Sequence, residues 1–291
     1  MIPALPDFLC YLNGNFSPLS EAKVSVLDRG FIFGDGVYEV LPAYEGRIFR
    51  FAQHMARLER SLRELRIPEP HSRDEWLAIA QRLIADQQSR GARHQLVYLQ
   101  VTRGVALRDH AMPPDLTPTV FAMGSEMKLP TDEQRQQGVS CVTADDFRWR
   151  KAHIKSTSLL GSVLARQISV DAGATETIMF RDGFLSEAAA SNVWVVRAGV
   201  VMGPPKDNLV LEGVRYGLIE DLCRQAGIGF ELRRITRDEV LTADEVMLSS
   251  AGKEVLPVTT IDGQPVGQGR PGPVCARLHA LYQQAVAEQS V

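Results

Sequence analysis

The sequence predicts an α+β protein built from two layered domains. Its 291 residues suit one large domain or two of moderate size. The hydrophobic fraction of 45% and the charged fraction of 23% are typical of globular proteins. Segments with the alternation of strands follow one another early in the chain, and segments with helical periodicity are interspersed among them.

Strand and helix patterns define the N-terminal half. Turn residues at Asn13-Gly14 and Glu45-Gly46 close the first strand and a hairpin. A helix of regular apolar spacing then ends before Pro68, since the residue before proline disfavours helical geometry. This half is expected to contain strands over 9–15, 36–44, 47–49, 95–102 and 119–123, and helices over about 55–65 and 76–84.

A polar, proline-containing stretch over 126–137 suggests a linker. We therefore expect a small domain over 1–123, an interdomain linker over 124–137 and a large domain over 138–291. In the large domain the expected strands are 139–143, 176–180, 193–196 and 245–248, and the expected helices are 157–171, 214–225 and 272–287. The apolar face predicted for the helix over 157–171 is made of Leu159, Leu160, Val163, Leu164 and Ile168.

Composition argues against several classes of protein. The net charge of −3 argues against nucleic acid as the main partner. No apolar run approaches the roughly 18 residues that cross a bilayer, and the N-terminus lacks the basic region of a secretory signal. We expect no membrane association and a cytoplasmic location. The four widely spaced cysteines form no CxxC pair and are expected to be reduced and mostly buried: Cys10, Cys141, Cys223 and Cys275.

Familiar binding motifs are missing. The Gly34-Asp35-Gly36 segment lacks the third glycine of a dinucleotide loop and leads into a strand, so these glycines are expected to shape a turn. There is no P-loop, and the six histidines are scattered without the spacing of a metal site.

Lys155 is the best candidate for a nucleophilic amine. Only six of the 32 basic residues are lysines, and the other five stand among polar or turn-forming neighbours. Lys155 lies between a strand-like region and an apolar helix, where desolvation lowers the pKa of an amine. The alternative is a lysine whose stem packs while its ammonium reaches solvent.

Glu187 is the corresponding acidic candidate. It follows the Asp182-Gly183 turn, and the small residues after it leave room for a flat ligand to approach the backbone. A carboxylate there is suited to face a protonated ring nitrogen. The residues alone favour the alternative, a helix-forming surface segment.

Seven motifs occur along the chain in the order of one family. The chain resembles the fold-type IV pyridoxal-phosphate transaminases over roughly residues 8–285, and within them it looks most like the D-amino acid aminotransferases. The motifs are RGFIFGDGVYEV (29–40), HMARL (54–58), QVTRGVALRDH (100–110), HIKSTSLLGSVLARQ (153–167), SEAAASNVW (186–194), LVLEGVRYGL (209–218) and SSAGKEVLPV (249–258).

The resemblance implies a small α/β sandwich domain, a larger β-barrel-like domain with helices, and pyridoxal 5'-phosphate as cofactor. Lys155 then holds the cofactor covalently, and Glu187 pairs with its pyridine nitrogen. The implied phosphate and ring contacts are Arg57, Leu211, Val214, Arg215, Ser250, Ala251 and Gly252. The implied substrate-carboxylate contacts are Tyr38, Arg108 and His110. Since the last two come from the partner subunit in the family, a homodimer is expected.

Each of these side chains also has an ordinary structural interpretation. Arg57 would suit a solvated helix, Arg108-Asp109-His110 an exposed polar loop, and Tyr38 a core aromatic. Arg103, on a strand, and Lys253 are interpreted as structural.

The chain departs from the family pattern at Arg215, Ala251 and Gly252, where hydroxyl side chains are expected. Backbone amides and the Arg215 guanidinium are candidates to replace the lost phosphate contacts.

The implied reaction transfers the amino group of a D-amino acid, such as D-alanine, to a 2-oxo acid, such as 2-oxoglutarate. Alternatives on the same fold are a branched-chain L-amino acid aminotransferase, an aminodeoxychorismate lyase and an (R)-amine transaminase. A non-catalytic carrier or interaction protein is a further alternative, although Lys155 and Glu187 are both present.

Overall fold

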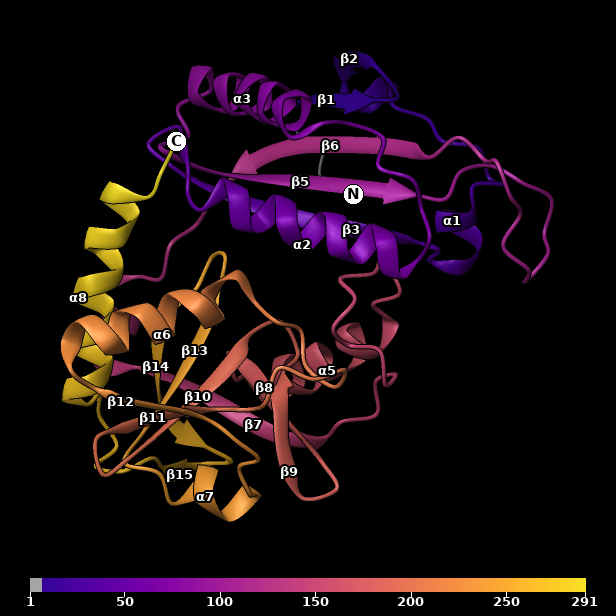
Figure 1. Cartoon of the computed structure of the whole chain (residues 1–291). Coiled ribbons are helices and arrows are strands. Elements are labelled where there is room, and N and C mark those ends of the chain that lie inside the picture. The colour runs from indigo at the N-terminus through magenta and orange to yellow at the C-terminus, as the bar shows by residue number, and fades with distance from the viewer. Residues whose placement is uncertain (1–6) are drawn as a thin grey trace. The chain divides into compact units, whose positions relative to one another are not determined.

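The computed structural model describes residues 7–291, which form two compact units (Figure 1). Unit 1 contains residues 7–128, 154–159 and 289–291, and unit 2 contains 129–153 and 160–288. The predicted linker over 124–137 holds the end of one strand and a short helix, α4 (Asp132–Gln137). Two short segments from the predicted large domain belong to unit 1, because their hydrogen bonds lie there.

A six-stranded antiparallel sheet forms the frame of unit 1, in the order β2-β1-β6-β5-β3-β4. Its strands are β1 (Leu9–Leu12), β2 (Asn15–Pro18), β3 (Gly36–Tyr44), β4 (Arg47–Ile48), β5 (His94–Thr102) and β6 (Thr119–Glu126). Its helices are α1 (Arg29–Phe33), α2 (Phe51–Glu64) and α3 (Arg73–Ser89), with a 3-10 turn over Leu19–Glu21. The predicted strands and the two long helices of this half are confirmed.

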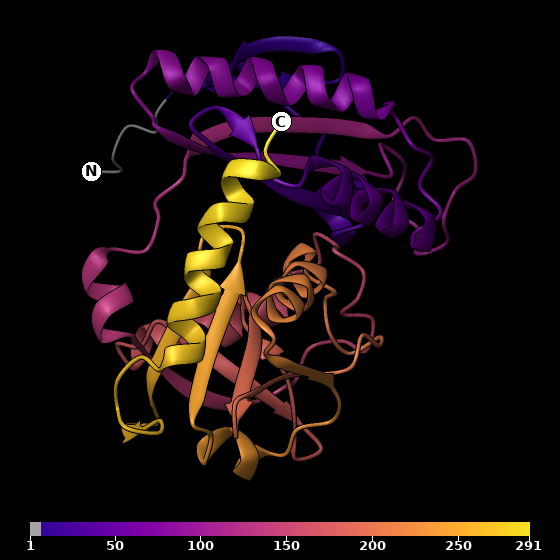
Figure 2. The same cartoon turned by 60° about the vertical axis from the view of Figure 1, so that its left-hand side comes forward.

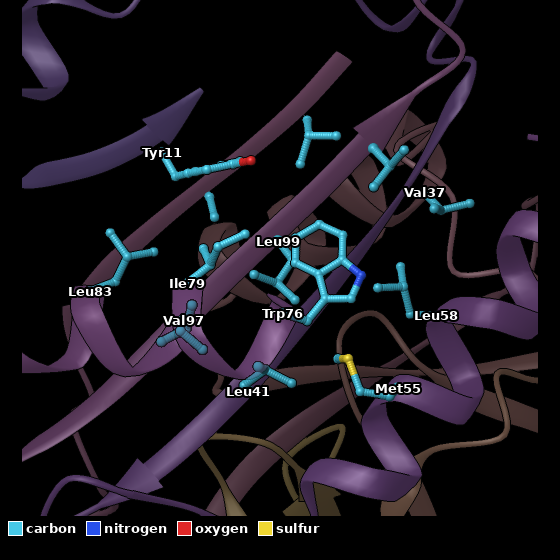
Figure 3. Packing of buried hydrophobic residues seen from close by; sticks show 14 of the residues in the cluster. Tyr11, Val37, Leu41, Met55, Leu58, Trp76, Ile79, Leu83, Val97 and Leu99 are labelled. Carbon is cyan, nitrogen blue, oxygen red and sulfur yellow. The ribbon is translucent and has the colours of Figure 1, made fainter. Parts of the chain in front are cut away.

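Helices α2 and α3 pack on one face of this sheet. Figure 3 shows Trp76 of α3 among strand residues such as Val97 and Leu99, with Met55 and Leu58 of α2 beside it. Every second residue of β3 and β5 points into this core, as a strand covered on one face requires. The opposite face carries Tyr38, Tyr98 and Gln100.

Residues 154–159 complete unit 1 beside the start of β3. The Tyr38 amide donates to the Lys155 carbonyl at 3.0 Å, and the Thr157 amide donates to the Gly36 carbonyl at 2.9 Å. Ile154 is buried in the core of unit 1. Gly36 leaves room on both sides, since a Cβ there would lie 2.8 Å from the Val101 carbonyl oxygen of β5 and 3.3 Å from the Thr157 hydroxyl.

A nine-stranded mixed sheet forms the frame of unit 2, in the order β12-β11-β10-β13-β14-β7-β8-β9 with β15 paired to β14. Its strands are β7 (Val139–Asp145), β8 (Glu176–Arg181), β9 (Phe184–Ala188), β10 (Asn192–Arg197), β11 (Val200–Gly203), β12 (Gly229–Leu232), β13 (Glu245–Ser250), β14 (Glu254–Ile261) and β15 (Gln264–Pro265). Besides α4, its helices are α5 (Leu160–Asp171), α6 (Val214–Ala226), α7 (Arg237–Leu241) and α8 (Pro273–Glu288). Figure 2 shows α8 running beside the strands of this unit.

Helix α5 is confirmed, but its predicted apolar face is open to solvent. Leu160 is 72% exposed, Val163 59% and Leu164 53%, whereas Ala165 and Ser169 are buried. The small side chains let the helix approach β8, and the Thr177 hydroxyl donates to the Ala165 carbonyl. The large apolar side chains are therefore left as a surface patch.

Several short helices and strands were not predicted from the sequence. Helices α4 and α7 each span one or two turns and begin with a capping box, at Thr131 and Thr236. Strand β9 was not expected, because the three alanines that follow Glu187, at 188–190, favour a helix. The four cysteines are buried and free, as predicted. Across residues 7–291, none of the helices has the length and apolar character needed to cross a membrane.

Candidate active site

Lys155 lies in unit 1 with its ammonium over an aromatic ring. Its Nζ is 4.0 Å from the centroid of the Tyr38 ring, and the side chain is half-buried. Among the described residues of unit 1, no carboxylate forms an ion pair with this ammonium. A cation on the face of tyrosine is stabilised without a bond that would occupy its nitrogen. The amine is therefore held in place and remains available for covalent chemistry.

Helix α2 connects Lys155 with Arg57. The Lys155 amide donates to the Ser61 hydroxyl at 3.3 Å, and Ser61 stands four residues after Arg57 on the same helical face. Tyr38, Arg57 and Lys155 therefore all belong to unit 1: Tyr38 contacts Lys155, and Arg57 lies one helical turn from the residue that binds the Lys155 backbone.

A buried carboxylate orients Arg57. Its Nε and Nη2 donate to the two oxygens of Glu39, at 2.9 and 2.6 Å, and His54 Nδ1 lies 2.9 Å from Glu39 Oε1. Burial acts to raise the pKa of Glu39, but Arg57 and His54 outweigh it and hold that pKa well below its usual value. The interpretation of Arg57 as a solvated helix residue is wrong, because its side chain is buried.

Arg108 and His110 lie on the exposed loop between β5 and β6. The Phe33 ring, at the end of α1, is 5.5 Å from the Arg108 guanidinium carbon and 5.4 Å from the His110 ring centre. The loop keeps two cationic or polar side chains together at the surface of unit 1.

Glu187 occupies the interior of unit 2. It lies on β9 with 6% exposure, so the interpretation as a helical surface segment is wrong. Arg148 Nη1 donates to Glu187 Oε1, and the same guanidinium binds Asp146 through Nε at 2.9 Å and Nη2 at 2.8 Å. Burial raises the pKa of Glu187 above its usual value, and the Arg148 charge opposes that shift.

The second oxygen of Glu187 faces the segment before α6. The Leu211 amide donates to Glu187 Oε2 at 3.2 Å, and Asn192 Nδ2 lies 3.4 Å from the same oxygen and 3.0 Å from the Leu211 carbonyl. At Gly213 an added Cβ would lie 2.1 Å from Asn192 Oδ1. Glu187, Leu211 and the start of α6 are therefore linked through Asn192 and the Leu211 amide.

Helix α6 begins at Val214 after Gly213, which supplies no side-chain cap. The first backbone amides of a helix have no partner within it and attract anions. The guanidinium of Arg215, in contrast, is buried and donates to the Tyr282 hydroxyl of α8 at 3.1 Å. The Arg215 backbone amide therefore remains a candidate phosphate contact. The guanidinium, which was also a candidate, instead joins α6 to α8.

Ser250, Ala251 and Gly252 form the turn between β13 and β14. The Ser250 hydroxyl accepts the Lys253 amide at 3.1 Å, which leaves its own hydrogen able to donate. No heavy atom lies within 4 Å of the Cβ position of Gly252, so the backbone is open on that side. Lys253 binds Glu176 at 2.8 Å and Ser191 at 2.9 Å, in agreement with a structural role.

Comparison with known proteins shows the family. The model of the family described as "Amino-transferase class IV" matches residues 36–261. D-alanine aminotransferase of Bacillus licheniformis is 40% identical over 278 residues, covering 96% of this chain and 97% of the relative. That of Staphylococcus aureus (strain COL) is 36% identical over 283 residues, covering 97% and 99%.

The chain belongs to the class IV aminotransferases.

Solved structures agree with this assignment. A branched-chain amino acid aminotransferase from T.th., solved with pyridoxamine 5'-phosphate, has a TM-score of 0.89 and 28% identity, covering 98% of this chain and 96% of that one. The Escherichia coli branched-chain enzyme has a TM-score of 0.87 and 25% identity, covering 96% and 94%. The fold-type IV architecture expected from the sequence is confirmed, and the protein is a pyridoxal-phosphate-dependent aminotransferase.

The residues present fit this cofactor. Unit 1 offers the Lys155 amine for the aldehyde and the Arg57 guanidinium for phosphate. Unit 2 offers a buried carboxylate, Glu187, which can accept a further hydrogen bond because a carboxylate has about four lone-pair positions.

Sequence reasoning missed Glu39, Arg148 and Asn192. Glu39 had a signal, because it stands at a core-facing position of an otherwise apolar strand. Asn192 was part of a quoted motif without a role. Arg148 had no signal of its own, since its partners Asp146 and Glu187 become neighbours only when β7 to β9 pair.

Proposed function

We propose that this enzyme transfers the amino group of a D-amino acid, such as D-alanine, to a 2-oxo acid such as 2-oxoglutarate. The observation that carries the proposal is the near full-length similarity to D-alanine aminotransferases at 34–40% identity. The branched-chain enzymes share the fold at 24–28% identity. The Arg108-x-His110 pair, implied by the resemblance to hold the substrate carboxylate, favours the D-specific reaction over the L-specific one.

The cofactor contacts are assigned residue by residue, as the family resemblance implies. Lys155 would bind the aldehyde carbon of pyridoxal phosphate, and Glu187 would hold a proton at the pyridine nitrogen. Leu211 packs on the ring. The phosphate is bound by Arg57, by the backbone amides of Val214 and Arg215, and by the turn of Ser250, Ala251 and Gly252. When bound, pyridoxal phosphate supplies an electron sink for the negative charge that develops at the substrate Cα.

The chain's own groups then move protons and orient the substrate. The Lys155 amine would act as the general base that takes the proton from the substrate Cα, and its Nζ would hold that proton. Tyr38, whose ring already contacts the Lys155 ammonium, binds the substrate carboxylate together with Arg108 and His110 of the partner subunit. That orientation selects the hydrogen presented to Lys155 and hence the D enantiomer.

A homodimer is the assembly that the surface supports. Leu160, Val163 and Leu164 form a contiguous exposed apolar patch on α5. Soluble chains rarely leave such a patch uncovered, and a second copy of this chain offers the same patch in return. The four free, buried cysteines support a reducing, cytoplasmic environment.

The substrate proposal is tested by half-reaction spectra. Purified holoenzyme is mixed with D-alanine, L-leucine or (R)-1-phenylethylamine, and the loss of the visible cofactor band is followed. We expect D-alanine to react fastest. Faster reaction with L-leucine would reject the proposal in favour of a branched-chain activity, and faster reaction with the amine would indicate an (R)-amine transaminase.

The lysine assignment is tested on the same spectra. Lys155→Ala removes the amine and is expected to abolish the visible band that the lysine-bound cofactor gives. Lys151→Ala, an exposed lysine four residues earlier, is the matched control and should keep the band. A reducible lysine adduct that persists in Lys155→Ala would contradict the assignment.

A further inference from the structure

The loop over 105–118 carries two proposed substrate contacts but has no helix or strand of its own. Arg108, Asp109 and His110 are all exposed on it. A side chain that binds a small carboxylate must be held in place, because about 1 Å of misplacement weakens such a contact severely. Something outside the loop must therefore restrict it.

The buried guanidinium of Arg29 restrains the loop near its centre. Arg29, the first residue of α1, is 3% exposed. Its Nη1 donates to the Asp109 carbonyl at 2.6 Å, between Arg108 and His110 in sequence. Its backbone amide donates to the Gly104 carbonyl at 2.9 Å, so the same residue also holds the start of the loop.

Arg29 is itself held by a carboxylate shared between two arginines. Its Nε donates to Asp35 Oδ2 at 2.8 Å, and Arg103 donates to the same oxygen at 2.8 Å and to Asp35 Oδ1 at 3.0 Å. Although burial acts to raise it, the guanidiniums of Arg103 and Arg29 hold the pKa of Asp35 below its usual value. Arg103 also donates to the Leu65 and Arg66 carbonyls, which anchors the cluster to the end of α2.

An aromatic ring adds a second restraint. Phe33, the last residue of α1, has the Arg29 guanidinium carbon 4.7 Å from its ring centre, and the Arg108 guanidinium and the His110 ring also contact it. Helix α1 thus meets the loop through one buried ionic anchor and one ring.

We infer that Arg29 is a positioning residue for the substrate carboxylate: held by Asp35, it fixes the loop so that Arg108 and His110 converge on one anion. This inference rests on the proposed role of Arg108 and His110, and it assigns no contact between Arg29 and substrate. It assigns a role to Arg29 and Asp35, a buried ion pair in the motif over 29–40 that has no assigned contact with the cofactor.

The test is a mutant cycle on the holoenzyme. Arg29→Lys keeps the charge beside Asp35 but loses the fork that reaches Asp35 and Asp109 at once. We expect KM for the amino acid to rise roughly 10-fold to 100-fold, with kcat nearly unchanged, because a charge-assisted hydrogen bond that holds a binding group is lost. In a background of Arg108→Ala with His110→Ala, the same substitution should change KM less than about 2-fold, because residues that act as one unit are not additive.

The cycle is run with whichever enantiomer the wild-type enzyme turns over, so a preference for an L-amino acid would reject the proposed function and leave this test intact. The control is Arg73→Lys, an exposed arginine that donates two hydrogen bonds to Glu59. Phe33→Leu tests the ring while leaving the buried ion pairs in place, and should raise KM only when Arg108 and His110 are present. Equal KM changes in both backgrounds, or an unchanged KM in Arg29→Lys, would overturn the inference.

Discussion

Glu187 shows how one side chain is prepared for its chemistry by neighbours from three segments. Arg148 neutralises it from the loop after β7, Asn192 supports it from β10, and the Leu211 amide donates from the segment before α6. A buried carboxylate without such partners would take up a proton near neutral pH. The Arg148 charge favours the ionised form, which can hold a proton on a partner nitrogen.

Glu187→Gln is expected to lower kcat by about 100-fold to 1000-fold. A neutral amide cannot stabilise the positive charge of a protonated pyridine nitrogen on the cofactor. Arg148 keeps its two bonds to Asp146, so the variant should fold. Steady-state kinetics with the preferred amino acid measure the effect. Glu231→Gln, an exposed glutamate of β12, is the control. An unchanged kcat would remove Glu187 from the reaction.

At the scale of elements, β3 and α2 are joined by a buried ionic cluster. Glu39 on the strand binds Arg57 and His54 on the helix, in a region that is otherwise apolar. Breaking a buried ion pair from one side leaves the other charge uncompensated. The cluster thus orients Arg57 while making the two elements dependent on each other.

Glu39→Gln is expected to lower the free energy of unfolding at pH 7 by about 3–5 kcal/mol. The folded pKa of Glu39 lies below its ordinary 4.5, so its stabilisation is complete above pH 4.5 and is lost as the pH falls through the folded value. The difference between wild type and variant should therefore shrink below pH 4.5. Urea unfolding at several pH values measures it.

The control for this cluster is Glu59→Gln, which breaks the exposed pair with Arg73 and should cost less than about 1 kcal/mol. If the deficit of Glu39→Gln stayed constant down to acid pH, or equalled that of the control, the cluster would not stabilise unit 1 through its charge.

At the scale of the whole molecule, the exposed patch on α5 is the feature that predicts assembly. Leu164→Asp places a charge on this patch and should shift the protein from dimer to monomer in sedimentation velocity. Gln225→Ala, an exposed polar residue of another helix, α6, should leave the assembly unchanged. A monomeric wild type, or a Leu164→Asp variant that stays dimeric, would contradict the proposal for this patch.

The sequence by itself determined the elements whose pattern is local. Alternation over 36–44 and 95–102 and the helical periods of α2, α3 and α6 were sufficient to place them, because strand and helix geometry repeat over a few residues. The ordered motifs also indicated the family, and with it Lys155 and Glu187.

Only the tertiary structure decided which charges meet. Arg148 reaches Glu187, Arg29 reaches Asp109 and Arg57 reaches Glu39 across sequence separations of 39, 80 and 18 residues. It also decided that the large apolar residues of α5 face outward, since burial depends on what packs against a helix and not on its own period. Side-chain pairs of this kind have no local signature, because their energy exists only once distant strands are paired and water is excluded.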